Sequence, residues 1–321
     1  MTVLLWGMPT ECVFAAVERA LRQANVSTFL LDQQASLSME LDLEIGATVT
    51  GTLRVDDHSL NLTAVTAAYV RPYDGRTLPW IAAAGPASAA WQHVEAFERS
   101  LWSWADLTPA LVVNRPRAMS SNASKPYQLE LLRKLGWDVP RTLVTTDPEA
   151  ALAFWEEHGE VIYKSVSGVR SKVARLRPEH RERMAHVASC PTQFQEHIPG
   201  VDHRVHVVGQ AVFACEVQCD ADDYRYADGH PRTLRECPLP SNIGERCIAS
   251  AAALRLPVCG IDLRRTREGR WYCFEVNPSP AFTFYESATK QPISAAIARL
   301  LADEARDGRQ SQRPTENEVT Q

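Results

Sequence analysis

The stretch GIDLRRTREGRWYCFEVNPSPAF, residues 260–282, alternates apolar and polar residues on both sides of the dipeptide Glu268-Gly269. This pattern is typical of a β-hairpin. If these two residues form the loop, Asp262 lies directly opposite Glu275. Both carboxylates then share one face of the sheet, where directly opposed like charges are destabilising. The pattern therefore calls for a positive group between them, or for a face screened by solvent.

The same alternation separates the remaining residues of the hairpin. It predicts a core face formed by Ile261, Leu263, Phe274 and Val276. It places Asn277 on the face of Asp262 and Glu275. Two carboxylates and an amide oxygen are hard oxygen ligands, which suit a Mg²⁺ ion that also binds nucleotide phosphates. These three residues are the candidate metal ligands, and a solvent-exposed, screened face is the alternative.

Composition sets wide limits on the function. The chain has 321 residues, 45% of them hydrophobic and 23% charged, which is long and apolar enough for several packed subdomains. The net charge of −5 and the pI near 6.0 provide no general attraction to nucleic acid or to an anionic membrane. The start lacks a signal-peptide pattern and the eight cysteines are scattered singly, so we expect a cytoplasmic protein with reduced thiols.

The N-terminal part predicts an open α/β domain. Strands over 2–6 and 26–32 bracket an amphipathic helix over 11–24, followed by a hairpin near 47–65 and a strand over 67–71. The chain contains neither a GxG motif nor a GK dipeptide, so the dinucleotide fingerprint and the P-loop are both excluded. After a proline near 116 the order changes to helices over 125–135 and 148–158 and then mostly strands, which predicts an α/β part followed by an α+β part.

Two of the five lysines stand in unusual places. Lys125 begins a helix and Lys164 lies inside the apolar strand VIYK. The loop SVSGVRS after that strand, residues 165–171, contains small residues and Arg170, and its backbone could close over phosphates. The alternatives are that Lys164 extends its amine to solvent and that the loop is an ordinary turn.

A second group of polar residues follows in FQEHIPGVDHRVHVVG, residues 194–209. The backbone of Gln195, Glu196, His197 and Ile198 could read an adenine, and Asp202 could bind ribose hydroxyls. A surface hairpin with an Asp202–Arg204 ion pair is the alternative. The segment DADDYRYADG, 220–229, holds Arg225 between two tyrosines, and a solvated loop is its alternative.

Taken together and in order, these segments resemble the ATP-grasp superfamily, most closely the RimK-type glutamate ligases and the ligases that modify ribosomal peptides. The resemblance covers about residues 114–300: the two lysines, the QE-x-I-x-G-x-D-x-R segment, DYR, GIDLRR, EVNPSP and a closing helix. It implies an ATP-grasp fold after an N-terminal α/β domain. The implied division is 1–113, 114–190 (central subdomain), 191–305 (C-terminal subdomain) and a disordered tail, 306–321.

The resemblance also implies a role for each candidate. Lys125 and Lys164 would contact phosphates, with Arg170 nearby, and residues 195–198 would form the adenine hinge. Arg204 and Arg225 would neutralise the transferring phosphoryl group, and Asp202 would bind ribose. The metal ligands would be Asp262, Glu275 and Asn277. Tyr226-Ala227 replaces the polar pair expected after Arg225, which leaves the nucleotide contacts of that loop open.

The implied reaction is an ATP-dependent carboxylate–amine ligation through an acyl phosphate, which releases ADP and phosphate. The cofactors would be ATP and Mg²⁺, with Mn²⁺ as a substitute and two ions bound. The substrates would be small molecules or peptides, without nucleic acid or membrane, and a homo-oligomer is left open. Two alternatives are a ligase that modifies or macrocyclises a ribosomal peptide, and a nucleotide-binding regulator without turnover.

Overall fold

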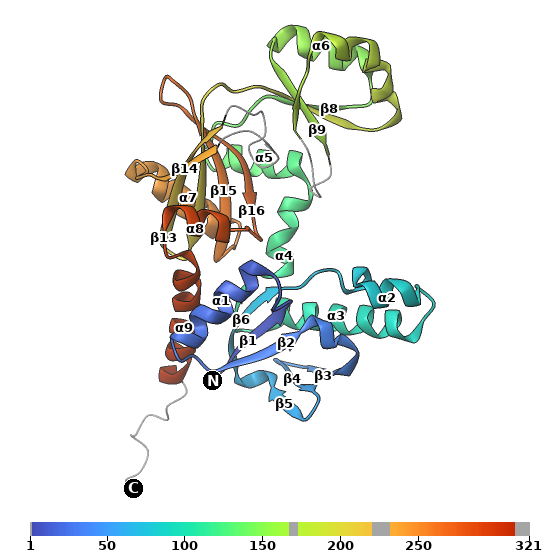
Figure 1. Cartoon of the computed structure of the whole chain (residues 1–321), viewed down its shortest axis with the longest axis vertical. Helices are drawn as coiled ribbons and strands as arrows, with labels where there is room; N and C mark the ends of the chain where they lie inside the picture. The colour runs from blue at the N-terminus through green and yellow to red at the C-terminus, as the bar shows by residue number, and fades with distance from the viewer. Residues whose placement is uncertain (1, 167–172, 220–231, 312–321) are drawn as a thin grey trace. The chain divides into compact units, whose positions relative to one another are not determined.

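The computed structural model describes residues 2–166, 173–219 and 232–311 (Figure 1). The chain divides into two compact units. The described residues up to Arg117, together with those from Pro292 onward, form the first unit, and residues 118–291 form the second. Within the described residues, every helix is too short or too polar to cross a bilayer.

The first unit is built on a parallel sheet with strand order β2-β1-β6-β7. Its strands are β1 (Thr2–Gly7), β2 (Thr28–Asp32), β6 (Val65–Arg71) and β7 (Leu111–Val113). β1 pairs in parallel with β2 and with β6, so the predicted βαβ opening is confirmed. The helix α1 (Cys12–Gln23) connects the first two strands.

Helices cover both faces of this sheet. α1 packs against the last helix, α9 (Ile293–Ser311), which also contacts β1 and β6. On the other face, α3 (Ala89–Leu107) contributes Leu101 and Trp104 to a cluster with Leu4 and Trp6 of β1. Short helices connect these elements: η1 (Gln33–Ser38), η2 (Leu62–Ala64), η3 (Gly75–Thr77) and α2 (Pro79–Ala84).

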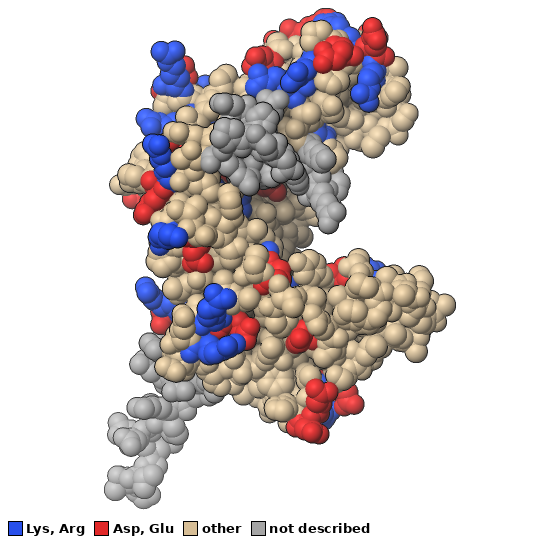
Figure 2. Space-filling model, viewed as in Figure 1, with Lys and Arg blue, Asp and Glu red and all other residues tan. Residues whose placement is uncertain are grey.

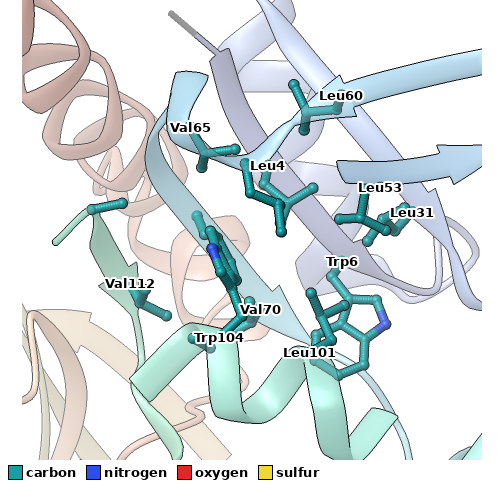
Figure 3. Packing of buried hydrophobic residues seen from close by; sticks show 14 of the residues in the cluster. Leu4, Trp6, Leu31, Leu53, Leu60, Val65, Val70, Leu101, Trp104 and Val112 are labelled. Atoms are coloured by element: carbon teal, nitrogen blue, oxygen red, sulfur yellow. The ribbon is translucent and has the colours of Figure 1, made fainter. Parts of the chain in front are cut away.

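A small antiparallel sheet closes the same cluster from the side. It consists of β3 (Met39–Ile45), β4 (Val49–Val55) and β5 (His58–Asn61). Figure 3 shows Leu53 and Leu60 of this sheet beside Leu4 and Trp6 of the parallel sheet, with Trp104 close by. The apolar residues of the small sheet are therefore part of the main core of the first unit.

The second unit begins with α4 (Pro116–Met119), which crosses the boundary between the units, and η4 (Ser120–Ala123). One of its sheets has the order β10-β9-β11-β8. These strands are β8 (Thr142–Thr145), β9 (Val161–Ser165), β10 (Ala174–Arg175) and β11 (Thr192–Glu196). Trp155 of α6 (Pro148–His158) and Met184 of η5 (Pro178–Ser189) pack on Phe194 at one face. The Asp147 side chain caps α6 by accepting a hydrogen bond from the Glu149 N–H.

The other sheet is antiparallel, with order β14-β13-β12-β15-β16. Its strands are β12 (Val201–Val208), β13 (Ala211–Cys219), β14 (Arg232–Glu236), β15 (Val258–Arg265) and β16 (Trp271–Asn277). The helices α5 (Lys125–Lys134) and α7 (Ser241–Ala253) pack on one face through a cluster that includes Leu132, Ile243 and Val205. The opposite face carries α8 (Thr283–Thr289), whose Tyr285 packs on Cys215.

The hairpin of β15 and β16 confirms one part of the prediction and corrects another. Asp262 lies directly opposite Glu275, and Gly260 lies opposite Asn277. The register shifts after Asp262, however, so that Leu263 faces Cys273 and Phe274 is the extra residue of a β-bulge. Cys273 is fully buried in the core, whereas Phe274 faces the polar side. The predicted core position of Phe274 was therefore wrong.

The loop of this hairpin is also longer than predicted. The strands end at Arg265 and Trp271, and the Thr266 N–H donates to the Arg270 carbonyl. Gly269 adopts a φ of 84°, a conformation that L-residues with a side chain rarely take. The two-residue loop was wrong because the bulge adds a residue to β16 and shifts the register between Asp262 and the turn.

Candidate active site

A pocket in the second unit collects most of the candidate residues. Its lining comes from both sheets and from the start of α5: Lys125, Ile162, Lys164, Val173, Gln195, Glu196, His197, Ile198, Asp202, Asp262, Arg264, Phe274 and Glu275. Segments separated by up to 150 residues in sequence thus meet at one place, as the ATP-grasp resemblance implies.

The other candidates lie beside the pocket or outside the described residues. Arg204 and Asn277 lie on the same sheet face as Asp262 but do not line the pocket. Arg170 and Arg225 lie outside the described residues, so their predicted roles stay predictions. Sequence reasoning missed four pocket residues: Ile162, Val173, Arg264 and Phe274.

Two ion pairs cross between β12 and β15. Asp202 lies opposite Arg264, and Arg204 lies opposite Asp262. The Arg264 guanidinium donates to both carboxylate oxygens of Asp202, at 2.7 and 2.9 Å. Arg204 Nη1 donates to Asp262 Oδ1 at 2.6 Å. The arginine beside Asp262 is one positive group that offsets the repulsion between the opposed carboxylates, and the alternative Asp202–Arg204 pair is not formed.

The three candidate metal ligands present a suitable donor set. Asp262 and Glu275 are adjacent across the strands, and Asn277 follows on the same face. The Asn277 Oδ1 accepts a hydrogen bond from the Ser279 N–H at 2.8 Å, which fixes the amide while a second lone pair remains. Oxygen donors on one side of an ion suit Mg²⁺, which completes its shell with water and phosphate oxygens. The residues present therefore fit the predicted ion.

Lys164 points into the pocket instead of reaching solvent. It is 9% exposed, and its Nζ donates a hydrogen bond to Gln195 Oε1 at 3.2 Å. Gln195 is held in turn by Thr142, whose Oγ1 accepts from Gln195 Nε2 at 2.9 Å. A buried ammonium is costly unless anionic or polar groups surround it. This placement favours the phosphate-contact role over a lysine that extends its amine to solvent.

Lys125 occupies the first turn of α5. The positive end of a helix dipole is there, so a cation at this position is unfavourable unless an anion is close. Ser124 precedes it as the N-cap residue, but its side chain makes no capping hydrogen bond among the described residues. Lys125 lines the pocket at the N-terminal end of the helix, and a positive side chain at that end suits a phosphate.

The hinge residues are held by backbone contacts. The Arg141 N–H donates to Glu196 Oε1 at 2.7 Å, and the Glu196 N–H donates to the Arg141 carbonyl at 3.0 Å. The His197 N–H donates to the Glu160 carbonyl at 2.8 Å. The Ile198 carbonyl accepts from Arg264 Nη1 at 2.9 Å, so it is already engaged. The edge of the pocket is thus fixed before a ligand arrives.

His206 lies under the polar face of β12 with an unusual environment. It is 1% exposed, its ring lies 5.1 Å from that of Tyr285, and neither ring nitrogen has a hydrogen-bond partner within the part of the chain that the structure describes. Burial, and next the charge of Arg204, hold the pKa of His206 well below its ordinary value. The imidazole is therefore neutral in the folded protein and acts as an apolar filler.

We expect the free energy of unfolding of His206→Leu to fall less steeply than that of the parent as the pH is lowered. Below about pH 6.5 the unfolded chain protonates this histidine while the folded chain does not, so acidification favours unfolding. Removing the group should reduce the pH slope of the unfolding free energy by up to about 1.4 kcal/mol per pH unit. Urea unfolding between pH 5 and 8 measures this slope. The matched control is His58→Leu at an exposed position, and an unchanged slope in His206→Leu would contradict the assignment.

Comparisons with known proteins find a family model and several relatives. Residues 122–301 match the model of the RimK-like ATP-grasp domain. A probable alpha-L-glutamate ligase of Teredinibacter turnerae is 27% identical over 251 residues, which cover 74% of this chain and 81% of that protein. Beta-citrylglutamate synthase B of Danio rerio is 24% identical over 202 residues, 59% of this chain and only 50% of that protein.

Solved structures give the same result for the fold. The macrocyclase MdnC of Microcystis aeruginosa, bound with precursor peptide MdnA, superposes with a TM-score of 0.80 at 23% identity, covering 94% of this chain and all of MdnC. The ATP-grasp ligase PsnB, in complex with a variant of its minimal precursor, Mg and ADP, has a TM-score of 0.78 at 26% identity and covers 94% and 98%.

These matches confirm the predicted fold class and the predicted enzyme class. ATP-grasp ligases of this type form C–N bonds and use ATP and Mg²⁺. The match to the family model spans more than half of the chain and includes every described residue of the pocket. The chain belongs to the RimK-like ATP-grasp family.

Proposed function

We propose that the protein joins a substrate carboxylate to an amine in two steps. The carboxylate oxygen attacks the γ-phosphorus of ATP, and the bond to the β–γ bridging oxygen breaks, which gives an acyl phosphate and ADP. The amine nitrogen then attacks the acyl carbon, and phosphate leaves as the amine loses a proton. The products are an amide, ADP, phosphate and a proton.

The side chains of the pocket suit the first step. Lys125 and Lys164 would bind the phosphates, while the hinge from Gln195 to Ile198 would hold the base and Asp202 the ribose. Arg204, fixed by Asp262, would oppose the negative charge on the phosphoryl group during transfer. Such a site accelerates the reaction mainly by positioning and by fixed charges.

Asp262, Glu275 and Asn277 would hold Mg²⁺. When bound, the ion shields the phosphate oxygens from the approaching carboxylate and polarises the phosphoryl group. The number of ions and the use of Mn²⁺ stay predictions.

The observation that carries the proposal is the cross-strand pair of Asp262 and Glu275 in one pocket with Lys125 and Lys164. Acidic and basic groups in that arrangement suit a metal-bound polyphosphate better than a neutral ligand. We expect ATP, Mg²⁺ and the true substrates to give ADP and phosphate, with a product lighter than its separate reactants by one water. Nucleotide chromatography and mass spectrometry measure both.

The experiment separates the alternatives. Release of AMP and pyrophosphate would contradict the acyl-phosphate route. Tight Mg²⁺-ATP binding without turnover across free amino acids, amines and peptides would favour the regulator. The control reaction contains all components except the carboxylate, so that uncoupled ATP hydrolysis is subtracted.

A peptide substrate is the favoured refinement. Structures of PsnB complexed with precursor peptides align over 94% of this chain at 25–26% identity, including the first unit. On the face drawn in Figure 2, Lys and Arg lie among Asp and Glu in scattered groups. The panel should therefore include peptides rich in glutamate, aspartate and lysine.

A further inference from the structure

Gly260 leaves space that Arg204 fills. Gly260 lies in β15 opposite His206 of β12 and opposite Asn277 of β16. A Cβ atom at this position would lie 2.6 Å from Arg204 Cζ and closer still to Arg204 Nη2. The backbone of Gly260 has no left-handed φ, so the strand itself does not require glycine. Glycine is therefore required at residue 260 because it has no side chain, and not because of its backbone conformation.

Other groups hold the Arg204 guanidinium over this space. Asp262 accepts from Nη1 at 2.6 Å, and the ring of Tyr285 lies 5.9 Å from Cζ. His206 packs against the same ring and contributes a neutral imidazole. Only 7% of the Arg204 side chain is exposed. A cation this enclosed has little freedom to choose another rotamer, because interiors are close-packed.

The position of the guanidinium follows from the register. Arg204 starts on β12, and its tip lies over Gly260 of β15, in the row that Gly260 shares with Asn277 of β16. The charge is thereby carried along the shared face, from β12 towards the row of Asn277. A side chain at residue 260 would block this path.

We propose that Gly260 is a positioning residue that seats Arg204 for phosphoryl transfer. The role of Arg204 in phosphoryl transfer rests on the proposed function. The packing of the Arg204 guanidinium over Gly260, which we call the seat, does not. One rival explanation exists: a Cβ at residue 260 would also lie 2.9 Å from Pro280 Cβ, so glycine could serve the close approach of the segment around Pro280. The two explanations differ in whether Arg204 must be present for the substitution to have an effect.

A double-mutant cycle of Gly260→Ala and Arg204→Ala distinguishes them. We expect Gly260→Ala to fold with some loss of stability, because the two atoms nearest the new methyl group belong to the Arg204 guanidinium, which must leave its enclosed position, and not to the backbone. It should lower kcat by about tenfold with little change in the KM for ATP, since a displaced charge weakens the transition state more than nucleotide binding. In the Arg204→Ala background, the same substitution should have almost no further effect on kcat.

The control is Gly244→Ala in α7, where the new methyl group meets nothing within 4 Å and both kcat and stability should be kept. Full activity of Gly260→Ala would overturn the proposal. A double variant whose fold loss in kcat equals the product of the two single losses would also overturn it, because the substitutions would then act independently. The cycle is also measured by urea unfolding without nucleotide. If the two substitutions are coupled in the free energy of unfolding but the parent protein forms no ADP, the proposed function is refuted and the packing of Arg204 over Gly260 is retained. If they are not coupled, the packing of Arg204 over Gly260 is itself refuted.

Discussion

Replacing Glu275 with glutamine is expected to lower ADP formation by about a thousandfold, equivalent to about 4 kcal/mol of transition-state stabilisation. Asp262 already shares its charge with Arg204 through a 2.6 Å contact. Glu275 has no ion-pair partner among the residues that the structure describes, so its charge is the one available to a metal ion. Steady-state ADP release at saturating ATP and Mg²⁺ measures the effect.

The same substitution should leave the free protein at least as stable as the parent. Glu275 and Asp262 are directly opposed, so removing one charge relieves repulsion. Arg264 is engaged with Asp202 by two hydrogen bonds, which argues against a structural Glu275–Arg264 pair. Thermal melts should show that Mg²⁺-ATP stabilises the parent far more than the variant.

The control for this variant is Glu216→Gln, on the opposite face of the same sheet. It should keep both activity and the ligand-induced rise in melting temperature. If Glu275→Gln melts early without ligand yet gains the full shift with Mg²⁺-ATP, Glu275 supports the fold and does not bind the metal.

Replacing Lys164 with methionine is expected to weaken ATP binding by about ten- to a hundredfold, since charge-assisted contacts contribute about 1.5–3 kcal/mol. Methionine keeps most of the volume of this buried side chain while removing its charge. Without nucleotide the variant should be as stable as the parent or more stable, because an ammonium at 9% exposure is poorly solvated. Calorimetric titration with a non-hydrolysable ATP analogue measures the affinity.

Lys134→Met is the matched control. Lys134 ends the helix that Lys125 begins, and its side chain is 66% exposed near Glu130. Its loss should not change nucleotide affinity. An unchanged affinity in folded Lys164→Met would show that this lysine only fills its strand position.

Sequence patterns predicted the residues of the pocket better than their contacts. The alternation of β15 and β16 placed Asp262 and Glu275 on one face, but their pairing was counted from a two-residue loop and was correct only because the longer loop and the bulge shift the register in opposite directions. It could not reveal the bulge at Phe274. Cys273 and Phe274 are both apolar, so either could fill the core position, and only packing against the helices decides between them.

The sequence contains a pattern that could have predicted the two ion pairs between β12 and β15. β12 contains Asp202-His203-Arg204 and β15 contains Asp262-Leu263-Arg264. Two D-x-R triplets in antiparallel neighbours place each acid opposite the other strand's arginine, as observed. This inference requires knowing that β12 pairs with β15, and the sequence alone does not show that two strands more than fifty residues apart are neighbours in the sheet. For the same reason, the seat over Gly260 could not be predicted: it depends on where a side chain from another strand ends.

The return of α9 to the first unit has a consequence for how the protein is made. Ile297 and Leu301 of this helix are fully buried, and α9 packs on α1, β1 and β6, which were synthesised first. Domains generally fold as they leave the ribosome, but this one must wait for the final helix while the whole second unit emerges in between. During that interval the apolar side of α1 lacks its partner, so the nascent chain exposes an apolar surface until α9 has emerged.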